Sequence, residues 1–336
     1  MIDSFKRVLV TGGAGCIGLA VCKELHKRKI EVVSYDLHEQ MKRAEADLPK
    51  EVIPYLGSIL DNSALRDAAI GCDGIIHLAA YLGVRRTEIN PLRCLEINIT
   101  GTKNVIEMGL HAGVKKIIFA SSSEVYGEPL SNPIDENSIT QGKTVYGITK
   151  LAGEELVKAY AKRYKTLDFS ILRYFNTYGI NQISQFVIPK FIRSVLENKS
   201  PVIYGDGNQS RSYCFAQDTA WATVQALLES TTDEQTINIG NSKEPINLKQ
   251  LADLIIEVMD KKNKIFPTLK ESFELTDRTK DREINNRFCD TSKAHELLNY
   301  EPKVSLTDGI KKVVEHGVLY PNWLTSDEYY TIDDYV

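Results

Sequence analysis

The sequence lacks the features that mark membrane-spanning, disulfide-bonded and nucleic-acid-binding proteins. No apolar run approaches the roughly 18 residues that a membrane-spanning helix needs, and residues 1–7 lack the regions of a signal peptide. The 6 cysteines are scattered without a Cys-x-x-Cys pair, so we expect reduced thiols and no metal site. Lys and Arg number 41 against 45 Asp and Glu, a balance that does not favour nucleic acid as a partner. We therefore expect a globular, cytoplasmic protein that binds neither membranes nor nucleic acid.

The first half of the chain alternates short β-branched segments with longer amphipathic segments, which is the pattern of parallel strands joined by helices. Buried strands are predicted at residues 7–11, 31–35, 51–56, 74–78, 116–121 and 168–173. Helices are predicted at residues 15–27, 62–69, 91–112 and 146–163. This order predicts an α/β fold with a doubly wound parallel sheet, the Rossmann architecture.

The alternation stops near residue 175, where turn-forming residues begin to separate shorter elements. We predict a Rossmann domain at residues 1–175, to which residues 214–240 return as a helix and a strand. Residues 176–213 and 241–318 are expected to form a smaller α/β substrate-binding lobe at the carboxyl ends of the strands. Residues 319–336 form an acidic tail that is rich in aromatic residues.

A glycine-rich turn follows the first predicted strand. Gly12, Gly15 and Gly18 have the spacing Gly-x-x-Gly-x-x-Gly and enclose Cys16 and Ile17 at the start of a predicted helix. Glycines here let the turn close, let backbone N–H groups approach a pyrophosphate at the positive helix end, and let the helix pack on the sheet. The turn therefore predicts a dinucleotide site.

The end of the second predicted strand bears on the choice of dinucleotide. Asp36 stands there, 18 residues after Gly18. A carboxylate at this place accepts hydrogen bonds from both ribose hydroxyls and repels a 2′-phosphate, so the sequence favours NAD. Lys42 and Arg43 follow closely and leave NADP open.

Tyr146 and Lys150 lie four residues apart in a predicted helix and therefore share one helical face. An ammonium beside a phenol, together with a cationic nicotinamide, lowers the phenol pKa from about 10 toward the working pH. Tyr146 is then able to take a hydroxyl proton while a hydride leaves the same carbon. Ser122 follows another predicted strand at the same sheet edge and is expected to hydrogen-bond that hydroxyl.

Over nearly its whole length the chain resembles the extended short-chain dehydrogenase/reductase family of NAD-dependent nucleotide-sugar epimerases and dehydratases, which includes UDP-sugar 4-epimerases and uronic-acid decarboxylases. The matching motifs occur in the family's order: the glycine turn, His77-Leu78-Ala79-Ala80, Asn98-Ile99-Thr100-Gly101-Thr102, Ser122-Ser123-Glu124-Val125-Tyr126-Gly127, Tyr146 with Lys150, and Arg173-Tyr174-Phe175-Asn176.

The resemblance implies roles for the residues of these motifs. Tyr146 would be the base, Lys150 its partner and a ribose ligand, and Ser122 the partner of the substrate hydroxyl. Asn98 would be a structural or proton-relay residue. The NAD site would be formed by the glycine turn, Asp36 and the catalytic pair together with Leu78, Ala79 and Ala80.

The resemblance also implies a nucleoside-diphosphate sugar as substrate and a homodimer. Asn176 would meet the diphosphate, Tyr204 lies in the segment that packs on the base, and Arg211 would reach the phosphates because a guanidinium binds phosphate oxygens bidentately. A second phosphate-binding arginine is expected at Arg278 or Arg282. The dimer would form through the helices that start at Pro91 and Tyr146.

The shared chemistry is oxidation at the sugar C4, and the fate of the 4-keto sugar stays open. We favour C4 epimerisation of a UDP-sugar because it needs only Tyr146, Ser122 and Lys150. A 4,6-dehydratase or a uronic-acid decarboxylase needs a further acid/base group, for which Glu124, next to the predicted substrate-binding Ser123, is the candidate. Arg85 would pair with a substrate carboxylate in that case.

Two other classes of protein remain as alternatives. One is a cofactor-binding regulator without turnover, and the other is an NAD-dependent reductase of a small carbonyl compound. The joint presence of Ser122, Tyr146 and Lys150 disfavours the regulator, and Asn176 with Arg211 disfavours the reductase.

Overall fold

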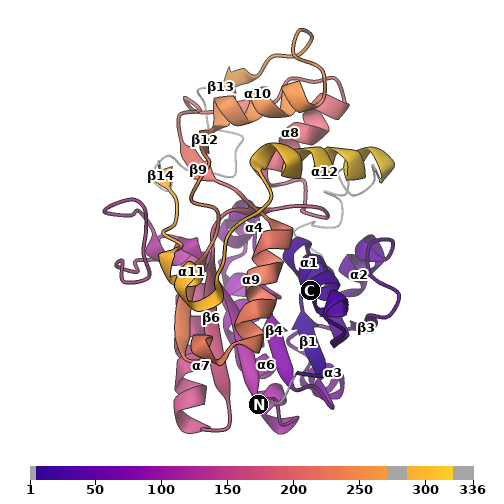
Figure 1. The fold of residues 1–336 in the computed structure, drawn as a ribbon, viewed down its shortest axis with the longest axis vertical. Coiled ribbons are helices and arrows are strands. Elements are labelled where there is room, and N and C mark those ends of the chain that lie inside the picture. The colour runs from indigo at the N-terminus through magenta and orange to yellow at the C-terminus, as the bar shows by residue number, and fades with distance from the viewer. Residues whose placement is uncertain (1–4, 271–285, 321–336) are drawn as a thin grey trace.

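The computed structural model describes residues 5–270 and 286–320, and within them a seven-stranded parallel sheet lies at the centre of the larger part of the molecule (Figure 1). The strand order is β11-β6-β5-β4-β1-β2-β3. The bounds are β1 Arg7–Thr11, β2 Glu31–Asp36, β3 Ile53–Leu56, β4 Gly74–His77, β5 Lys116–Ser122, β6 Asp168–Tyr174 and β11 Gln235–Ile239. The doubly wound Rossmann sheet predicted from the sequence is confirmed.

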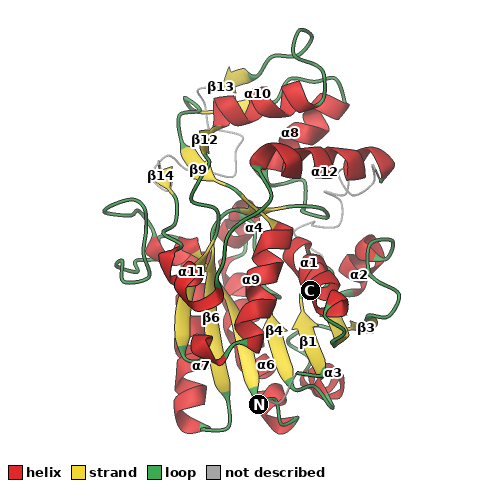
Figure 2. Cartoon of the chain, viewed as in Figure 1, coloured by secondary structure: helices red, strands yellow, loops and turns green. Residues whose placement is uncertain are grey.

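Helices cover both faces of this sheet, as Figure 2 shows. Because side chains alternate along a strand, Val8 and Val10 pack with one helix layer and Leu9 packs with the other. The first layer holds α1 (Cys16–Lys27), α9 (Ala216–Leu228) and α11 (Ser292–Leu298), and the second holds α3 (Asn62–Ala69), α6 (Gly101–His111) and α7 (Val145–Arg163). The helices cover the faces of the sheet and not the carboxyl ends of its strands.

The helix predicted at residues 91–112 is divided into three parts. These are α5 (Pro91–Leu95), a π-helix at Glu96–Thr100 and α6. Two short helices that the sequence did not predict are α2 (His38–Ala44) and α4 (Val84–Ile89).

A smaller lobe lies over the carboxyl ends of the strands (Figure 1). It has its own apolar core, built around Phe191, Ile203, Ile255 and Ile310. Its elements are α8 (Val187–Leu196), β8 (Val202–Tyr204), β9 (Ser210–Ser212), β12 (Pro245–Asn247), α10 (Leu248–Val258), β13 (Thr268–Lys270), β14 (Asn286–Arg287) and α12 (Leu306–Leu319).

The chain passes between the sheet and the lobe more than once. After β6 it forms β7 (Thr177–Tyr178) and enters the lobe, and it returns through β10 (Cys214–Phe215), α9 and β11. β11 pairs in parallel with β6 at the edge of the sheet. Residues 241–318 were expected to belong to the lobe, but α11 packs its Ala294 and Leu298 into the core of the sheet instead.

Candidate active site

The glycine turn lies where β1 meets α1. Gly12 has φ +71°, and a Cβ atom on it would stand 2.7 Å from the backbone nitrogen of Ala79. A side chain therefore fits poorly at this position. Gly15 precedes α1 and supplies no side-chain cap, which leaves the first N–H groups of a 12-residue helix open to a ligand. Backbone N–H groups at such a helix start have the chemistry that a phosphate group requires.

Asp36 ends β2 next to this turn. Its Oδ2 accepts a hydrogen bond from Ala14 N at 3.0 Å, and its Oδ1 accepts one from Leu37 N at 2.8 Å. Burial raises the pKa of Asp36 to about 6, and these two N–H groups oppose the shift. Each carboxylate oxygen keeps a further lone pair, so the carboxylate is able to accept hydrogen bonds from ribose hydroxyls.

The segment after β4 completes this edge. Leu78 N donates to Thr11 O at 3.0 Å, and Ala79 N donates to Thr11 Oγ1 at 3.4 Å. Leu78 and Ala79 are thereby fixed against the end of β1, with Ala80 following. The residues predicted to bind the cofactor thus meet at one edge of the sheet, and their chemistry fits NAD.

The predicted catalytic residues also lie at this edge. Ser122 is the last residue of β5, and Tyr146 and Lys150 lie in the first turns of α7, whose start is capped by Thr144 Oγ1 accepting from Gly147 N at 3.0 Å. Ser122 lies close enough to Tyr146 for its hydroxyl to lower the pKa of the phenol. Lys150 Nζ donates to Ala120 O at 2.8 Å and stands 5.7 Å from the centroid of the Tyr146 ring.

The electrostatics of Tyr146 differ from the prediction. Burial raises the pKa of Tyr146, the charge of Glu124 raises it further, and the hydroxyl of Ser122 opposes the shift. Burial also lowers the pKa of Lys150 to about 8. The sequence predicted that Lys150, together with a cationic nicotinamide, lowers the pKa of Tyr146. In the structure burial has the largest effect on this pKa, and the ammonium of Lys150 donates to Ala120 O.

Asn98 lies in the π-helix, and its side chain bonds the segment after β4 and α7. Its Oδ1 accepts from Tyr81 N at 2.7 Å, and its Nδ2 donates to Tyr81 O and to Thr149 Oγ1, both at 3.0 Å. The side chain is 3% exposed. Of the two roles implied by the resemblance, these contacts support the structural one, because they tie the segment after β4 to α7.

One residue of the site was missed by the sequence reasoning. Arg287, in β14, donates from Nη2 to Glu124 Oε1 at 2.6 Å. It is 7% exposed, and its Nε and Nη1 atoms have no hydrogen-bond partner among the described residues. β14 pairs in parallel with β9 and sets Arg287 opposite Arg211, a long-range pairing that no local sequence pattern indicates.

The structure describes some of the remaining predicted substrate residues, each in its own segment. Arg211 is half-buried in β9 and donates from Nη1 to Ser210 O at 2.8 Å. Asn176 separates β6 from β7 with φ +34°, and the ring of Tyr204 lies 5.6 Å from Lys190 Nζ. Ser123 is 2% exposed. Arg278, Arg282 and the side chain of Arg85 lie outside the described residues.

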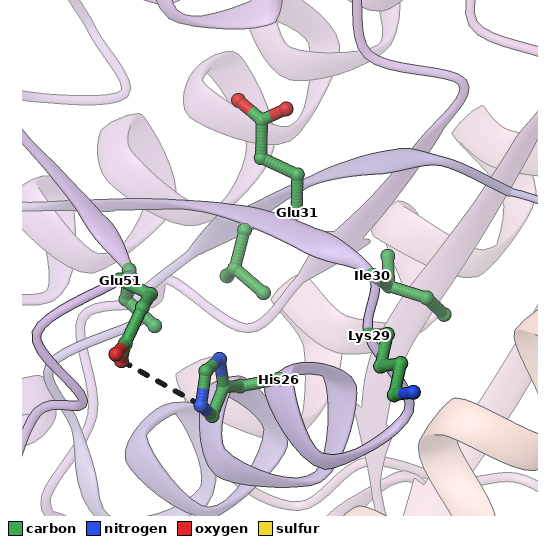
Figure 3. Close-up of a pocket in the computed structure, with 7 residues that line it drawn as sticks. His26, Lys29, Ile30, Glu31 and Glu51 are labelled. Carbon is green, nitrogen blue, oxygen red and sulfur yellow. Dashed lines mark ion pairs between the residues drawn. The ribbon is translucent and has the colours of Figure 1, made fainter.

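A surface pocket at the other end of the sheet is separate from this site (Figure 3). His26, Lys29, Glu31 and Glu51 line it, and the Nε2 atom of His26 lies 3.6 Å from Glu51 Oε2. Glu31 begins β2, whereas Asp36 ends it, so this pocket is at the amino edge of the sheet. Among the described residues no cluster of His, Cys, Asp and Glu has a metal-binding arrangement, and no helix could span a membrane.

A profile of the family described as "NAD dependent epimerase/dehydratase family" matches residues 8–240. The chain belongs to the NAD-dependent epimerase/dehydratase family. It is therefore an NAD-dependent enzyme, and the family and cofactor predicted from the motifs are confirmed.

Members of this family resemble the chain over almost its full length. It is 34% identical to the UDP-N-acetyl-alpha-D-glucosaminuronate decarboxylase of Bacillus cytotoxicus, over 92% of this chain and 97% of that protein. The UDP-glucose 4-epimerase of Thermotoga maritima, solved with UDP-glucose, is 30% identical with a TM-score of 0.83, over 93% and 99% of the two chains. The UDP-glucuronic acid 4-epimerase of Bacillus cereus, solved with UDP-glucuronic acid and NAD, is 30% identical with a TM-score of 0.81, over 94% and 100%.

Proposed function

We propose that this enzyme inverts the configuration at C4 of a UDP-sugar through a transient 4-keto sugar. The observation that carries this proposal is the convergence of Ser122, Tyr146 and Lys150 beside the glycine turn. These residues suffice for oxidation and its reversal at one carbon. Relatives that are named UDP-sugar 4-epimerases support the substrate class.

The chain's own residues move the proton. Ser122 holds the C4 hydroxyl, and Tyr146 in its phenolate form takes the hydroxyl proton as the C4 hydride leaves. Lys150 stabilises the phenolate through its charge. NAD, when bound, supplies the hydride acceptor and a positive charge. After the ketone turns over, the hydride returns to the other face of C4 and Tyr146 gives the proton back, so no NADH is consumed.

The experiment that tests this proposal is incubation with UDP-, GDP-, CDP- and dTDP-sugars in deuterated water, with NMR of the products. We expect a UDP-sugar to be converted to its C4 epimer without deuterium at C5. Deuterium at C5, or a product with one carbon fewer, would contradict simple epimerisation.

A second function is favoured by one observation, the ion pair of Glu124 with Arg287 at 2.6 Å. A buried guanidinium suits a carboxylate when two of its nitrogen atoms lack partners among the described residues, and Glu124 stands beside it as an acid/base group. With a UDP-hexuronic acid, the C5–C6 bond of the 4-keto sugar would break and CO2 would leave. The electron pair would pass to the C4 enolate, C5 would be protonated, and the hydride would return to C4.

Glu124→Gln separates the two functions. We expect this variant to form bound NADH with a UDP-hexuronic acid but to release no CO2, because oxidation needs only Tyr146, Ser122 and Lys150. Glu128→Gln, in the same loop and with 38% of its side chain exposed, is the matched control and should behave as the wild type. Loss of NADH formation in Glu124→Gln would assign Glu124 a structural role.

We also infer a homodimer and a cytoplasmic location. Ile89, Leu92 and Ile148 on α4, α5 and α7 are 47%, 77% and 50% exposed, and such apolar side chains are suited to a subunit interface. All six cysteines are free thiols, which fits a reducing compartment. Sedimentation equilibrium of the wild type against Leu92→Glu tests the dimer.

A further inference from the structure

The segment between β7 and α8, residues 179–186, lies directly over the glycine turn. Asn181 Nδ2 donates to Ala14 O at 3.0 Å, and a Cβ atom on Gly179 would stand 3.4 Å from Cys16 Sγ. Asn181 is 1% exposed and has φ +64°, so it is held firmly in this position. A segment that leads into the lobe therefore covers the turn that receives the cofactor phosphates.

Arg43 of α2 fastens this segment from the other side. Its Nε donates to Asn181 Oδ1 at 3.0 Å, and its Nη2 donates to Asn181 O. The side chain of Asn181 is thus bonded to both Ala14 and Arg43. Because α2 follows β2 closely, Arg43 lies between the Asp36 end of the cofactor site and the lobe segment.

The remaining nitrogen of Arg43 is available to a ligand. Its Nη1 atom is buried and has no hydrogen-bond partner among the described residues. Burial raises the pKa of Cys16 to about 12 and that of Asp36 to about 6, and the charge of Arg43 opposes both shifts. The guanidinium therefore acts on both the glycine turn and the ribose-binding carboxylate. A buried charged donor without an acceptor is unfavourable, and an anionic ligand at this place would satisfy it.

We propose that Arg43 is a cofactor-binding residue whose Nη1 donates to the diphosphate of bound NAD, while Nε and Nη2 hold Asn181 and close residues 179–186 over the dinucleotide. The diphosphate is the anionic part of NAD, and it belongs at the glycine turn. One guanidinium would then bind the cofactor and secure the segment that retains it. An enzyme that returns a hydride to the same sugar must keep its reduced dinucleotide bound until that step.

The test is the binding of NADH and NADPH to the full-length enzyme after removal of its cofactor, followed by the fluorescence of the reduced dinucleotides. Arg43→Met keeps the length of the side chain and removes its charge and donors. We expect it to weaken binding of NADH and NADPH alike by roughly ten- to a hundredfold, the range for loss of a charged hydrogen bond. Lys42→Met, which changes an exposed neighbour in the same helix, is the matched control and should bind NADH like the wild type.

A second variant separates phosphate binding from the closing of the segment. In Asn181→Gly, glycine tolerates the positive φ at this position, and only the side chain that bonds Ala14 and Arg43 is lost. We therefore expect faster NADH dissociation with a smaller loss of affinity than in Arg43→Met. Equal effects of the two variants would mean that Arg43 acts only on the segment, and this would overturn the proposal. Unchanged NADH affinity in Arg43→Met, or a loss confined to NADPH, would overturn it as well.

If Arg43→Met does not fold, Arg43→Lys retains one charged donor and decides the matter through thermal unfolding. We expect added NADH to raise its Tm by less than it raises the Tm of the wild type. An equal rise would contradict a diphosphate contact that needs the guanidinium.

Discussion

Single residues in this site are controlled mainly by burial. Burial raises the pKa of Tyr146, lowers that of Lys150 to about 8, and raises that of Asp36 to about 6. In each case the uncharged form is favoured until a ligand changes the surroundings. Proton transfer by Tyr146 therefore depends on charges that arrive with the cofactor and on the neighbouring ammonium.

Tyr146→Phe removes the phenol oxygen and little else. We expect turnover with UDP-sugars to fall by roughly 10²- to 10⁴-fold, the usual contribution of a general base. Formation of bound NADH, followed by absorbance after mixing with UDP-sugar, measures the loss. Tyr164→Phe, at the end of α7 with 39% exposure, is the control and should keep full activity. Normal NADH formation in Tyr146→Phe would remove this residue from the oxidation step.

Asp36 predicts a pH dependence of cofactor binding. Its pKa is raised, so the folded protein holds the protonated form up to about pH 6. Protonation removes the charge that attracts the ribose hydroxyls, and NADH affinity should therefore fall as the pH is lowered through about 6. Titration of NADH fluorescence at a series of pH values measures the effect. In Asp36→Asn this transition should be absent, and its persistence there would assign it to another group.

At the scale of elements, the sequence predicted those helices, strands and turns that a local residue pattern determines. β1 and α3 have the predicted bounds, and the glycine turn, Ser122, Tyr146 and Lys150 meet at one sheet edge. The π-helix was not predictable, because it depends on Asn98 binding the backbone of Tyr81, 17 residues away. Two-residue β14 carries too little pattern to be recognised.

Asn98→Ala tests the π-helix as a structural element. It would remove the acceptor of the buried Tyr81 N–H and one of the donors to Tyr81 O, which costs roughly 1–3 kcal/mol of unfolding free energy. Urea unfolding measures this loss, and Asn137→Ala, at an exposed position, should change stability little. If stability is unchanged while activity is lost, Asn98 belongs to a proton relay.

At the scale of the whole molecule, contacts between distant segments hold the lobe on the sheet. Val304 N donates to Asp218 Oδ2 at 2.9 Å, and His316 Nε2 in α12 lies 2.8 Å from Asp47 Oδ2. His316 and Asp47 are 269 residues apart. No sequence pattern indicates such a pair, because each partner is an ordinary polar residue in its own segment.

Asp47→Asn tests the link between α12 and the sheet. Burial opposes the charged form of Asp47, but the hydrogen bond and the charge of His316 outweigh it and lower the pKa of Asp47. The carboxylate therefore stabilises the folded protein at pH values above the ordinary pKa of Asp. This stabilisation is lost as the pH falls through the lowered pKa. We expect the variant to lose about 1 kcal/mol at neutral pH, measured by calorimetry. Asp67→Asn, with 49% of its side chain exposed, should leave the Tm unchanged. An equal Tm shift in both variants would contradict the link.

The repeated passage of the chain between sheet and lobe limits how such enzymes can be recombined. A chimera joined at one boundary after β6 would exchange α9 and β11 along with the lobe, and would pair an edge strand from one parent with β6 from the other. Transplanting specificity therefore requires inserts on both sides of the α9–β11 unit, and the second must leave α11 with the parent that supplies the sheet.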